Sequence, residues 1–574
     1  MRLPPPTPEQ IAIHEDNSNI LCVRARAGSG KTTSLIGYAA ARPDQRLLYI
    51  CFSKAIQMEA AKKFPKNTDC RTMHSIAFGP VGRKYAQKLC SKLAAYEIVR
   101  ELGGAMVIAQ YAIATVVNYT TSAERELSGT HVPDKVQPMD AVRVLELAHR
   151  IWAGMCDEHN KTIRMTHDGY LKLFQLGAAY LGNYDGILLD EFQDTNPVTL
   201  DIFLRQSCRK VMVGDEYQSI FAFRNAVNAL DSITPDRSLY LTQSFRFGEG
   251  IANMASGLLR CFFDEKIGVI GKGKHPTTFN IDFEREHGIL CRTNAGVFEA
   301  AVFNIDTLSL HFIGGVENYQ FQNVLDAWWL YSRAFGEIKN PLIRAFGSYS
   351  EMKEYAEAVD DKELISLTRV VEKYGSDIPA LVDRVQREAL REREGSLVQI
   401  CTAHRSKGLE FDQVVLWDDY GTLIDDKTGY LMTPKTIEER EEIHLLYVAL
   451  TRAIRVIQLN TTIREWLDLY SKEIEQNFLT PPKVVPPSPV PEAQTQLPLE
   501  TALPESDAAA VPPAKGVQLS LVFQRDLVED AAVLDVLGLT ESPEVEDWLQ
   551  MQAVQRNMSM SDTIHQLLKE RMAS

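Results

Sequence analysis

The chain has 574 residues, of which 45% are hydrophobic and 24% charged, and its formal net charge is −15. This composition is that of an ordinary soluble globular protein, and the length predicts several domains rather than one. The negative charge argues against tight nonspecific binding to duplex nucleic acid, which needs a basic surface, but it does not exclude a local groove for one strand.

The N-terminal residues 1–6 (MRLPPP) form no apolar signal segment, and no later stretch is apolar over the length needed to cross a bilayer. We therefore expect a cytoplasmic protein. The nine cysteines are scattered, with no C-x-x-C pair and none of the Cys/His spacings of a zinc or iron–sulfur site. They are expected to be reduced and mostly buried.

Short apolar runs with strand-forming residues recur along the chain, each followed by a turn or a helical pattern. The runs lie at residues 20–23, 47–51, 186–189, 211–213, 397–400 and 414–417. Continuous apolar strands that alternate with helices are typical of parallel sheets covered on both faces. The sequence therefore predicts an α/β fold.

Two stretches break this alternation because they are rich in helical periodicity and poor in strand-type runs. We interpret them as helical insertions within two α/β cores. The expected order is a first core at residues 1–85 and 184–238 with an insertion at 86–183, and a second core at 239–311 and 396–475 with a short insertion at 312–395.

The C-terminal part changes composition. Around residues 481–513 it is dominated by Pro, Ala, Glu and Ser, with too few large apolar residues to build a core. We expect a disordered linker at 476–540, followed by a small helical hairpin at 541–574, where amphipathic helical spacing returns.

A candidate phosphate site follows the first apolar run, where ARAGSGKT occupies residues 25–32 ahead of a helical pattern. A strand, a tight glycine-rich turn and a helix N-terminus together present backbone N–H groups to an anion. Lys31 would bind the β- and γ-phosphates, and Thr32 would ligate Mg²⁺. Ala25 stands at the first glycine of the strict G-x-x-x-x-G-K-[ST] pattern, so a glycine-rich turn without this function is the alternative.

Two consecutive acids support the phosphate site. Asp190 and Glu191 end the apolar run at 186–189, and a buried strand end seldom carries unpaired charge. Asp190 is suited to Mg²⁺, and Glu191 to polarising an attacking water. The alternative is a capped strand end with solvated acids.

Together with other segments, these two elements resemble the UvrD-like, or 1A, branch of superfamily 1 helicases. The segments that carry the resemblance stand in the family's order, at residues 7–10 (Q motif), 49–55 (Ia), 71–75 (Ib), 213–224 (III), 243–246 (IV), 289–294 (the strand that follows), 402–411 (V) and 446–453 (VI). Within that branch the loop at 25–32, the phrase CRTMHSIAF at 70–78 and HFIGG at 311–315 are most similar to the motor of the F-box DNA helicase subgroup. We recognise no F-box in this sequence, so the ubiquitin-ligase partners of that subgroup are not expected here.

The resemblance implies a fold of two RecA-like motor cores and an ATP site between them. It implies that Gln10 reads adenine, Gln218 senses the γ-phosphate, Phe245 stacks on adenine, and Glu410 meets the ribose or the cleft between the cores. The implied catalytic set is Lys31, Asp190, Glu191, Gln218, Arg246 and Arg452; the implied ATP-binding set is Gln10, Ala27, Gly28, Ser29, Gly30, Lys31, Thr32, Thr33, Phe245 and Glu410, with Mg²⁺ on Thr32 and Asp190.

The resemblance also implies a DNA strand across both cores. Aromatic side chains can stack on any base, which suits movement irrespective of sequence, although ordinary core packing is an equal alternative for each. Relatives usually carry Trp at the position of Phe223, so stacking is expected to be weaker here. The implied DNA contacts are Phe52, Thr72, His74, Phe223, Arg224 and His404.

A short motif, QLSLVF, lies within the predicted linker at residues 518–523. It resembles the hexapeptide by which bacterial proteins dock on the sliding clamp, with Gln518, Leu521 and Phe523 filling the pocket, and an apolar anchor on a flexible tether is a sound binding device. A short strand or a chance match is the alternative. A clamp partner would place the protein in the bacterial cytoplasm or nucleoid.

The function expected from these features is that of an ATP-dependent 3′–5′ DNA helicase or single-stranded DNA translocase in repair, recombination or replication. The short second insertion favours translocation over robust strand separation. The alternatives are a translocase that strips recombinase filaments with little unwinding, and a clamp- or DNA-bound scaffold that uses ATP as a switch.

Overall fold

The computed structural model describes residues 5–177, 179–220, 233–305, 309–358, 361–389, 398–425 and 427–478. The chain divides into two units, residues 1–488 and 489–574, and all described residues belong to the first. The hairpin and the clamp motif with Gln518, Leu521 and Phe523 lie outside the described residues, as does nearly all of the linker, and these stay predictions.

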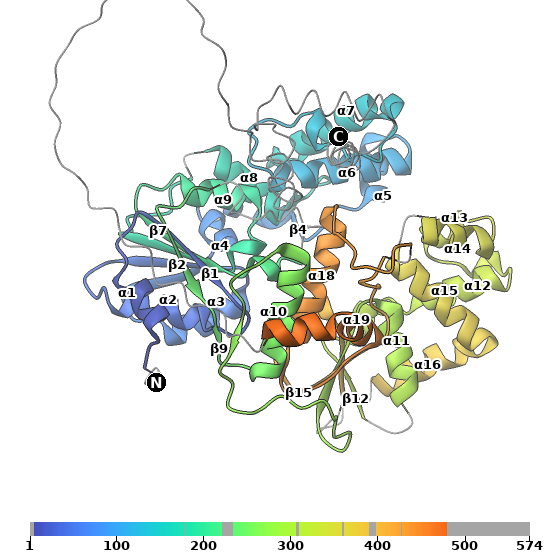
Figure 1. Ribbon diagram of the computed structural model, residues 1–574. Coiled ribbons are helices and arrows are strands. Elements are labelled where there is room, and N and C mark those ends of the chain that lie inside the picture. The colour runs from blue at the N-terminus through green and yellow to red at the C-terminus, as the bar shows by residue number, and fades with distance from the viewer. Residues whose placement is uncertain are drawn as a thin grey trace, which may run out of the picture. The chain divides into compact units, whose positions relative to one another are not determined.

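Within the described residues, six parallel strands form the first sheet, in the order β3-β2-β6-β7-β1-β8 (Figure 1). Every residue of β2 and β6 is buried, as expected for central strands with both faces covered. The strands are β1 Ile20–Ala25, β2 Leu47–Cys51, β3 Thr68–Thr72, β6 Gly186–Asp190, β7 Arg209–Gly214 and β8 Arg237–Leu241; their helices include α1 Pro8–Glu15, α2 Lys31–Ala40, α3 Lys54–Lys63, α4 Met73–Phe78 and α9 Pro197–Leu204.

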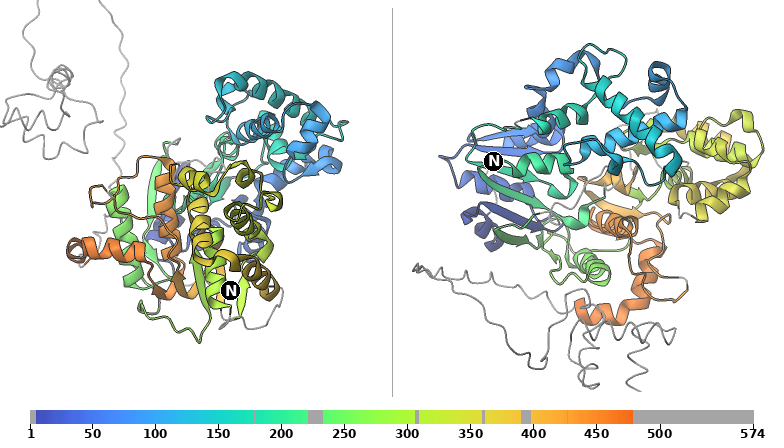
Figure 2. Two further views of the ribbon diagram at one scale, coloured as in Figure 1. Left: turned by 90° about the vertical axis from the view of Figure 1, so that its right-hand side faces the viewer. Right: turned by 90° about the horizontal axis from the view of Figure 1, so that it is seen from above.

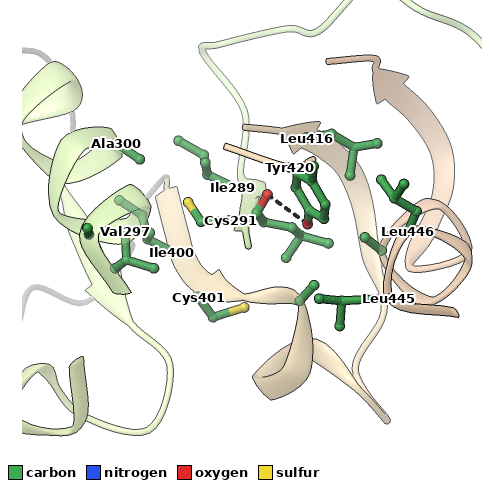
Figure 3. Close-up of a cluster of buried hydrophobic side chains, with 14 of the residues drawn as sticks. Ile289, Cys291, Val297, Ala300, Ile400, Cys401, Leu416, Tyr420, Leu445 and Leu446 are labelled. Carbon is green, nitrogen blue, oxygen red and sulfur yellow. Dashed lines mark hydrogen bonds between the residues drawn. The ribbon is translucent and has the colours of Figure 1, made fainter. Parts of the chain in front are cut away.

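Five parallel strands form the second sheet in the described part of the chain, in the order β12-β13-β11-β14-β15. Figure 3 shows its centre, where side chains of β11 and β13 lie between α11 and α18, and Tyr420 OH donates to Leu290 O at 3.3 Å. The elements are α10 Glu249–Phe263, β11 His287–Cys291, α11 Asn294–Asn304, β12 Leu310–Phe312, β13 Val398–Thr402, α17 Ala403–Ser406, β14 Phe411–Leu416, α18 Ile437–Leu450, β15 Ala453–Gln458 and α19 Thr461–Phe478. The predicted α/β fold with parallel sheets is confirmed.

A short parallel pair, β9 Gln243–Ser244 with β10 Ile270–Gly271, follows β8 in the chain. In the chain, this pair lies between the last strand of the first sheet, β8, and β11 of the second sheet. Residues 245 and 246, which carry two of the expected ATP contacts, come directly after β9.

The stretch between β3 and β6 is largely helical, and its helices gather in one group (Figure 2). Their side chains share a buried cluster with the first sheet. Among the described residues, no single helix is long and apolar enough to cross a membrane, although α5 and α6, which meet at 109°, pass that test of length and composition together. The elements are η1 Gly82–Lys88, β4 Leu89–Cys90, α5 Ala95–Leu102, α6 Met106–Thr121, η2 Gly129–His131, α7 Pro138–Cys156, β5 Met165–Thr166 and α8 His167–Leu176.

The helices between β12 and β13 share one hydrophobic cluster with the second sheet. The Glu363 carboxylate accepts hydrogen bonds from the backbone N–H groups of Asn294 and Ala295 at 2.9 and 3.2 Å, so it caps the start of α11. This stretch is therefore fixed on α11. Its elements are η7 Val316–Tyr319, α12 Gln322–Tyr331, η8 Phe335–Glu337, α13 Pro341–Ala345, α14 Tyr349–Ala358, α15 Lys362–Tyr374, η9 Gly375–Asp377 and α16 Ile378–Ala389.

Candidate active site

The glycine-rich loop connects β1 to α2 and has the conformation that a phosphate cradle needs. Gly28 and Gly30 have φ of 72° and 79°, a left-handed conformation that side chains disfavour. A Cβ atom on Gly28 would lie 2.8 Å from the Arg246 Cβ, and Phe245 N donates to Gly28 O at 2.9 Å. The segment after β9 therefore lies directly against the loop.

The two acids expected at the end of β6 face the first turn of α2. Glu191 Oε2 lies 2.6 Å from Lys31 Nζ, and Thr32 Oγ1 donates to Asp190 Oδ2 at 2.8 Å. Tyr49 OH donates to the same Asp190 oxygen at 2.7 Å. Glu191 has φ 53°, which is uncommon for a residue with a side chain and is typical of functional turns. The structure thus brings Lys31, Thr32, Asp190 and Glu191 together.

The environments of the two acids drive their pKa values apart. Burial, and then the charge of Glu191, raise the pKa of Asp190 above its usual range. Burial would also raise the pKa of Glu191, but Lys31 and Lys407 outweigh it and lower that pKa. Glu191 is therefore ionised at neutral pH, as a group that orients water must be.

The chemistry of the donors around Thr32 fits Mg²⁺. A hydroxyl and a buried carboxylate converge within 2.8 Å, and Mg²⁺ prefers oxygen ligands and keeps several waters or phosphate oxygens of its own. Among the described residues there is no group of three or more His, Cys, Asp or Glu side chains that could form a closed protein cage. An open two-ligand site is what a Mg²⁺–nucleotide complex requires.

Gln218 belongs to a buried network that reaches Glu191. Its Nε2 donates to Asp215 Oδ2 at 2.8 Å, and Asp215 N donates to Gln193 Oε1 at 3.0 Å. Gln193 Nε2 in turn donates to Glu191 Oε2 at 2.7 Å. A change at Glu191 can therefore reach Gln218 through two intermediates. Sequence reasoning missed Gln193 and Asp215, although Asp215 lies within the segment 213–224 and Gln193 stands two residues after Glu191.

The two expected arginines hold different partners. Arg246 donates from Nη2 to Glu410 Oε1 at 2.6 Å and from Nη1 to Thr451 O at 2.8 Å. Arg452 is 1% exposed and donates from Nε to Val448 O at 2.9 Å, inside the second core. Burial, and then the charge of Arg246, lower the pKa of Arg452 to about 9. Arg246 thus lies against the loop, whereas Arg452 is buried within the second core and bonded to its own segment.

Two further contacts join the cores at this site, and sequence reasoning missed both. Lys407 Nζ donates to Asp194 Oδ1 at 2.6 Å and also to Gln218 O. Tyr447 OH donates to Asp215 Oδ2 at 3.0 Å and accepts from Ala27 N at 3.3 Å. Lys407 lies in segment 402–411 and Tyr447 in segment 446–453. The sequence therefore identified both segments but did not predict which residues these side chains bond to.

The two residues expected at adenine lie on either side of the loop. Gln10 donates from Nε2 to Ser34 Oγ at 3.2 Å, and its Oε1 accepts from Thr7 N at 3.0 Å. A Cβ atom on Gly30 would lie 3.4 Å from Gln10 Nε2. Phe245, whose backbone N donates to Gly28 O, is 47% exposed, so part of this residue is accessible beside the loop.

The expected DNA contacts that the structure describes lie in three different settings. Phe52, which is 54% exposed, and His74 line one cavity of about 120 Å³ with Asp190 and Glu191. Thr72 is buried and accepts from Ser75 N at 3.2 Å, so here it caps α4. His404 lines a different cavity of about 400 Å³. Phe223 and Arg224 lie outside the described residues.

The electrostatics of His404 differ from those of a cationic phosphate contact. Burial, and then the charge of Arg292, lower the pKa of His404 to about 4, so the ring is neutral at neutral pH. Arg292, which lines the same cavity, pairs with Glu442. Glu441, Glu442 and Leu445 complete the lining, so the cavity offers little free positive charge to a phosphate backbone.

Two family models match overlapping parts of the chain, and relatives match most of its length. A family model described as the UvrD-like helicase C-terminal domain matches residues 150–460, and one described as an AAA domain matches residues 9–224. F-box DNA helicase 1 of Gallus gallus is 32% identical over 498 residues, which cover 80% of this chain and 49% of that relative. F-box DNA helicase protein 1 of Schizosaccharomyces pombe is 27% identical over 519 residues, covering 81% and 58%. The chain thus spans about half the length of these relatives.

Proposed function

This chain belongs to the UvrD-like helicase family, and from that premise we propose that it is an ATP-dependent DNA helicase that moves 3′ to 5′ along a single strand. The observation that carries the proposal is the contact between the loop and the segment that enters the second core. Phe245 N donates to Gly28 O, and Arg246 stands beside the loop. A nucleotide bound there touches both cores at once.

The first core supplies the binding and orienting groups for hydrolysis. Lys31 exchanges its bond to Glu191 for the β- and γ-phosphates, and this frees the Glu191 carboxylate to orient the attacking water. Thr32 and Asp190 would hold Mg²⁺, which when bound neutralises phosphate charge. Phosphoryl transfer needs little covalent help, so positioning and charge supply most of the catalysis.

The second core supplies cations. Arg246 exchanges Glu410, which is half-exposed, for the γ-phosphate, and the buried Arg452 adds a second positive charge that interacts with Arg246 and Glu191. Lys407 and Tyr447 already join this core to the Gln218 network. Repeated gain and loss of these contacts changes the spacing of the cores on the strand, which makes the ATPase a stepping motor.

The test is ATP hydrolysis measured with no nucleic acid, single-stranded DNA and RNA, followed by strand separation on duplexes with a 3′ or a 5′ tail. We expect single-stranded DNA to stimulate hydrolysis and the 3′-tailed duplex to be opened faster. Lys31→Ala should abolish stimulation, whereas Lys63→Ala, which removes a surface lysine paired with Glu59, should not. Absence of stimulation in the unaltered protein would refute the motor, and equal rates on both tails would refute the polarity.

The second candidate is a translocase that displaces bound protein with little unwinding. The second insertion is held on α11 by the Glu363 cap and by the contact of Thr293 Oγ1 with Ser366 Oγ at 3.0 Å, so it is presented as a fixed body rather than a free arm. Removal of a recombinase filament without opening of the tailed duplexes would favour this candidate. Robust unwinding with no displacement would reject it.

A further inference from the structure

Arg26 stands between β1 and the glycines of the loop, and its side chain joins the loop to the second core. Its Nε and Nη2 donate to Ile267 O at 3.1 and 2.8 Å, and Nη2 lies 2.7 Å from Glu265 Oε2. Glu265 and Ile267 follow α10, which packs in the cluster of the second core. Because the guanidinium is 1% exposed, this ion pair is buried.

Glu265 holds a second contact, which leads to the Gln218 network. Tyr217 OH donates to Glu265 Oε2 at 2.7 Å, and the Arg26 guanidinium lies 5.0 Å from the centre of the Tyr217 ring. Tyr217 directly precedes Gln218, which hydrogen-bonds to Asp215. Arg26, Glu265 and Tyr217 thus connect three parts of the site: the loop, the second core and the segment expected to sense the γ-phosphate.

This arrangement differs from that of a side chain that only fills space. Arg26 Nη1 is buried and has no hydrogen-bond acceptor within the described residues, which is costly for a donor on a charged group. The next residue repeats the connection, because Ala27 N donates to Tyr447 OH of α18. Two consecutive residues at the start of the loop are therefore bonded to the second core.

Building on the proposed function, we infer that Arg26 is a positioning residue that transmits occupancy of the phosphate loop to the second core, with Glu265 as its partner. Phosphates bound at residues 28–31 move the start of the loop, and the buried pair carries that movement to residues 264–267. The pair resists separation because either charge left alone in the interior is strongly unfavourable. Its two-pronged contact with Ile267 O uses the planar fork of arginine, which lysine lacks.

The first test compares Arg26→Gln, Glu265→Gln and their double variant in single-stranded-DNA-stimulated ATP hydrolysis. Each single variant should lower kcat by about tenfold to a hundredfold, since small displacements of a catalytic loop have effects of that size, and KM for ATP should change much less. The kcat of the double variant should be no lower than that of the less active single variant, because both substitutions remove the same interaction. Single-variant kcat values within about twofold of the unaltered protein, or fully multiplicative effects, would overturn the inference.

The second test needs no DNA and therefore separates this inference from the proposed function. Hydrogen exchange of residues 264–271 is measured with and without a non-hydrolysable ATP analogue. The analogue should slow exchange there in the unaltered protein and leave it unchanged in Arg26→Gln. Equal slowing of exchange in both proteins would overturn the inference. If exchange behaves as expected but DNA does not stimulate ATP hydrolysis, the role of Arg26 stands and the proposed motor function is refuted.

Two further variants control for folding. Arg26→Lys keeps the charge but not the fork, so its kcat should lie between those of the unaltered protein and Arg26→Gln, with a Tm near that of the unaltered protein. Arg46→Gln removes an arginine that is paired with Asp69 and is 60% exposed, and it should leave both readouts unchanged. If Arg26→Gln does not fold, Arg26→Lys and Glu265→Gln decide the question, and normal kcat in both would overturn the inference.

Discussion

The two halves of the candidate ATP site are held together in different ways. In the first core, the reactive side chains hold one another: Lys31 pairs with Glu191, and Thr32 donates to Asp190. In the second, Arg246 and Arg452 are held by backbone carbonyl oxygens and by the half-exposed Glu410. The Arg246 side chain is 10% exposed and that of Glu410 is 48% exposed, so water reaches the carboxylate side of this pair. Arg246 can therefore release this carboxylate to water and take up a phosphate in its place. The side chains of the first half are already bonded to one another, whereas Arg246 of the second half can exchange Glu410 for phosphate.

The largest effect should come from removing the Arg246 side chain. Arg246→Ala should lower the DNA-stimulated kcat by about 10³-fold or more, because an arginine that stabilises transferring phosphate contributes on that scale. Steady-state ATPase assays check this, with nucleotide affinity measured separately. Arg246→Lys should recover only part of the loss. A rise in KM with unchanged kcat would show that Arg246 acts only in binding, and the contrast between the halves would fail.

Glu191→Gln tests the first half of the site. Loss of the group that orients water should lower kcat by about 10²–10⁴-fold while nucleotide still binds. Single-turnover hydrolysis together with binding of a fluorescent nucleotide checks both parts. Glu59→Gln, at a surface carboxylate paired with Lys63, is the matched control and should behave as the unaltered protein does. If nucleotide affinity falls as far as kcat does, Glu191 serves to hold Lys31 in place rather than to orient water.

The joint between the halves should respond to acid. His444 Nδ1 donates to Ser219 O at 3.0 Å across the cores, and burial lowers the pKa of His444 to about 4 from 6.5. Between these values the unfolded chain binds more protons than the folded one, so stability is lost as pH falls from about 6.5 to 4, by at most about 3 kcal/mol for this group. In urea unfolding across that pH range, the free energy of unfolding should fall less steeply with decreasing pH for His444→Gln than for the unaltered protein. The exposed His149→Gln is the control, and identical pH profiles for His444→Gln and the unaltered protein would contradict this.

The smallest effect is expected at Glu410. Because its side chain is 48% exposed, Glu410→Gln should change the free energy of unfolding by less than about 1 kcal/mol. The same variant releases Arg246, so kcat should be retained. Thermal unfolding and ATPase assays check the two parts together. A loss of kcat similar to that of Arg246→Ala would mean that the Glu410 contact is needed in the active arrangement and is not a resting partner.

Central strands could be predicted from the sequence, and edge strands could not. β1, β2, β6 and β7 are continuous apolar runs because both their faces are covered. The strands at the sheet edges, β3, β8, β12 and β15, contain polar residues such as those of TDCRT in β3, and none was among the predicted runs. β11 is central and buried but was indicated only by the family resemblance.

The site shows a similar division. Lys31, Asp190 and Glu191 could be placed together because a glycine-rich loop and paired acids carry local patterns with known chemistry. The bonds of Lys407 to Asp194 and of Arg26 to Glu265 join residues more than two hundred positions apart. A single polar residue in a motif carries no signal of its distant partner, so these contacts could only come from the fold.

The second insertion has a topological consequence. β12 and β13 are adjacent and parallel, so the chain that leaves β12 must return to the opposite end of the sheet before β13 can begin. Parallel neighbours cannot be joined by a tight hairpin and need a crossover of about a dozen residues or more. The chain between β12 and β13 forms that crossover. This segment could be shortened, but deleting it outright would leave the edge strand unable to join its sheet.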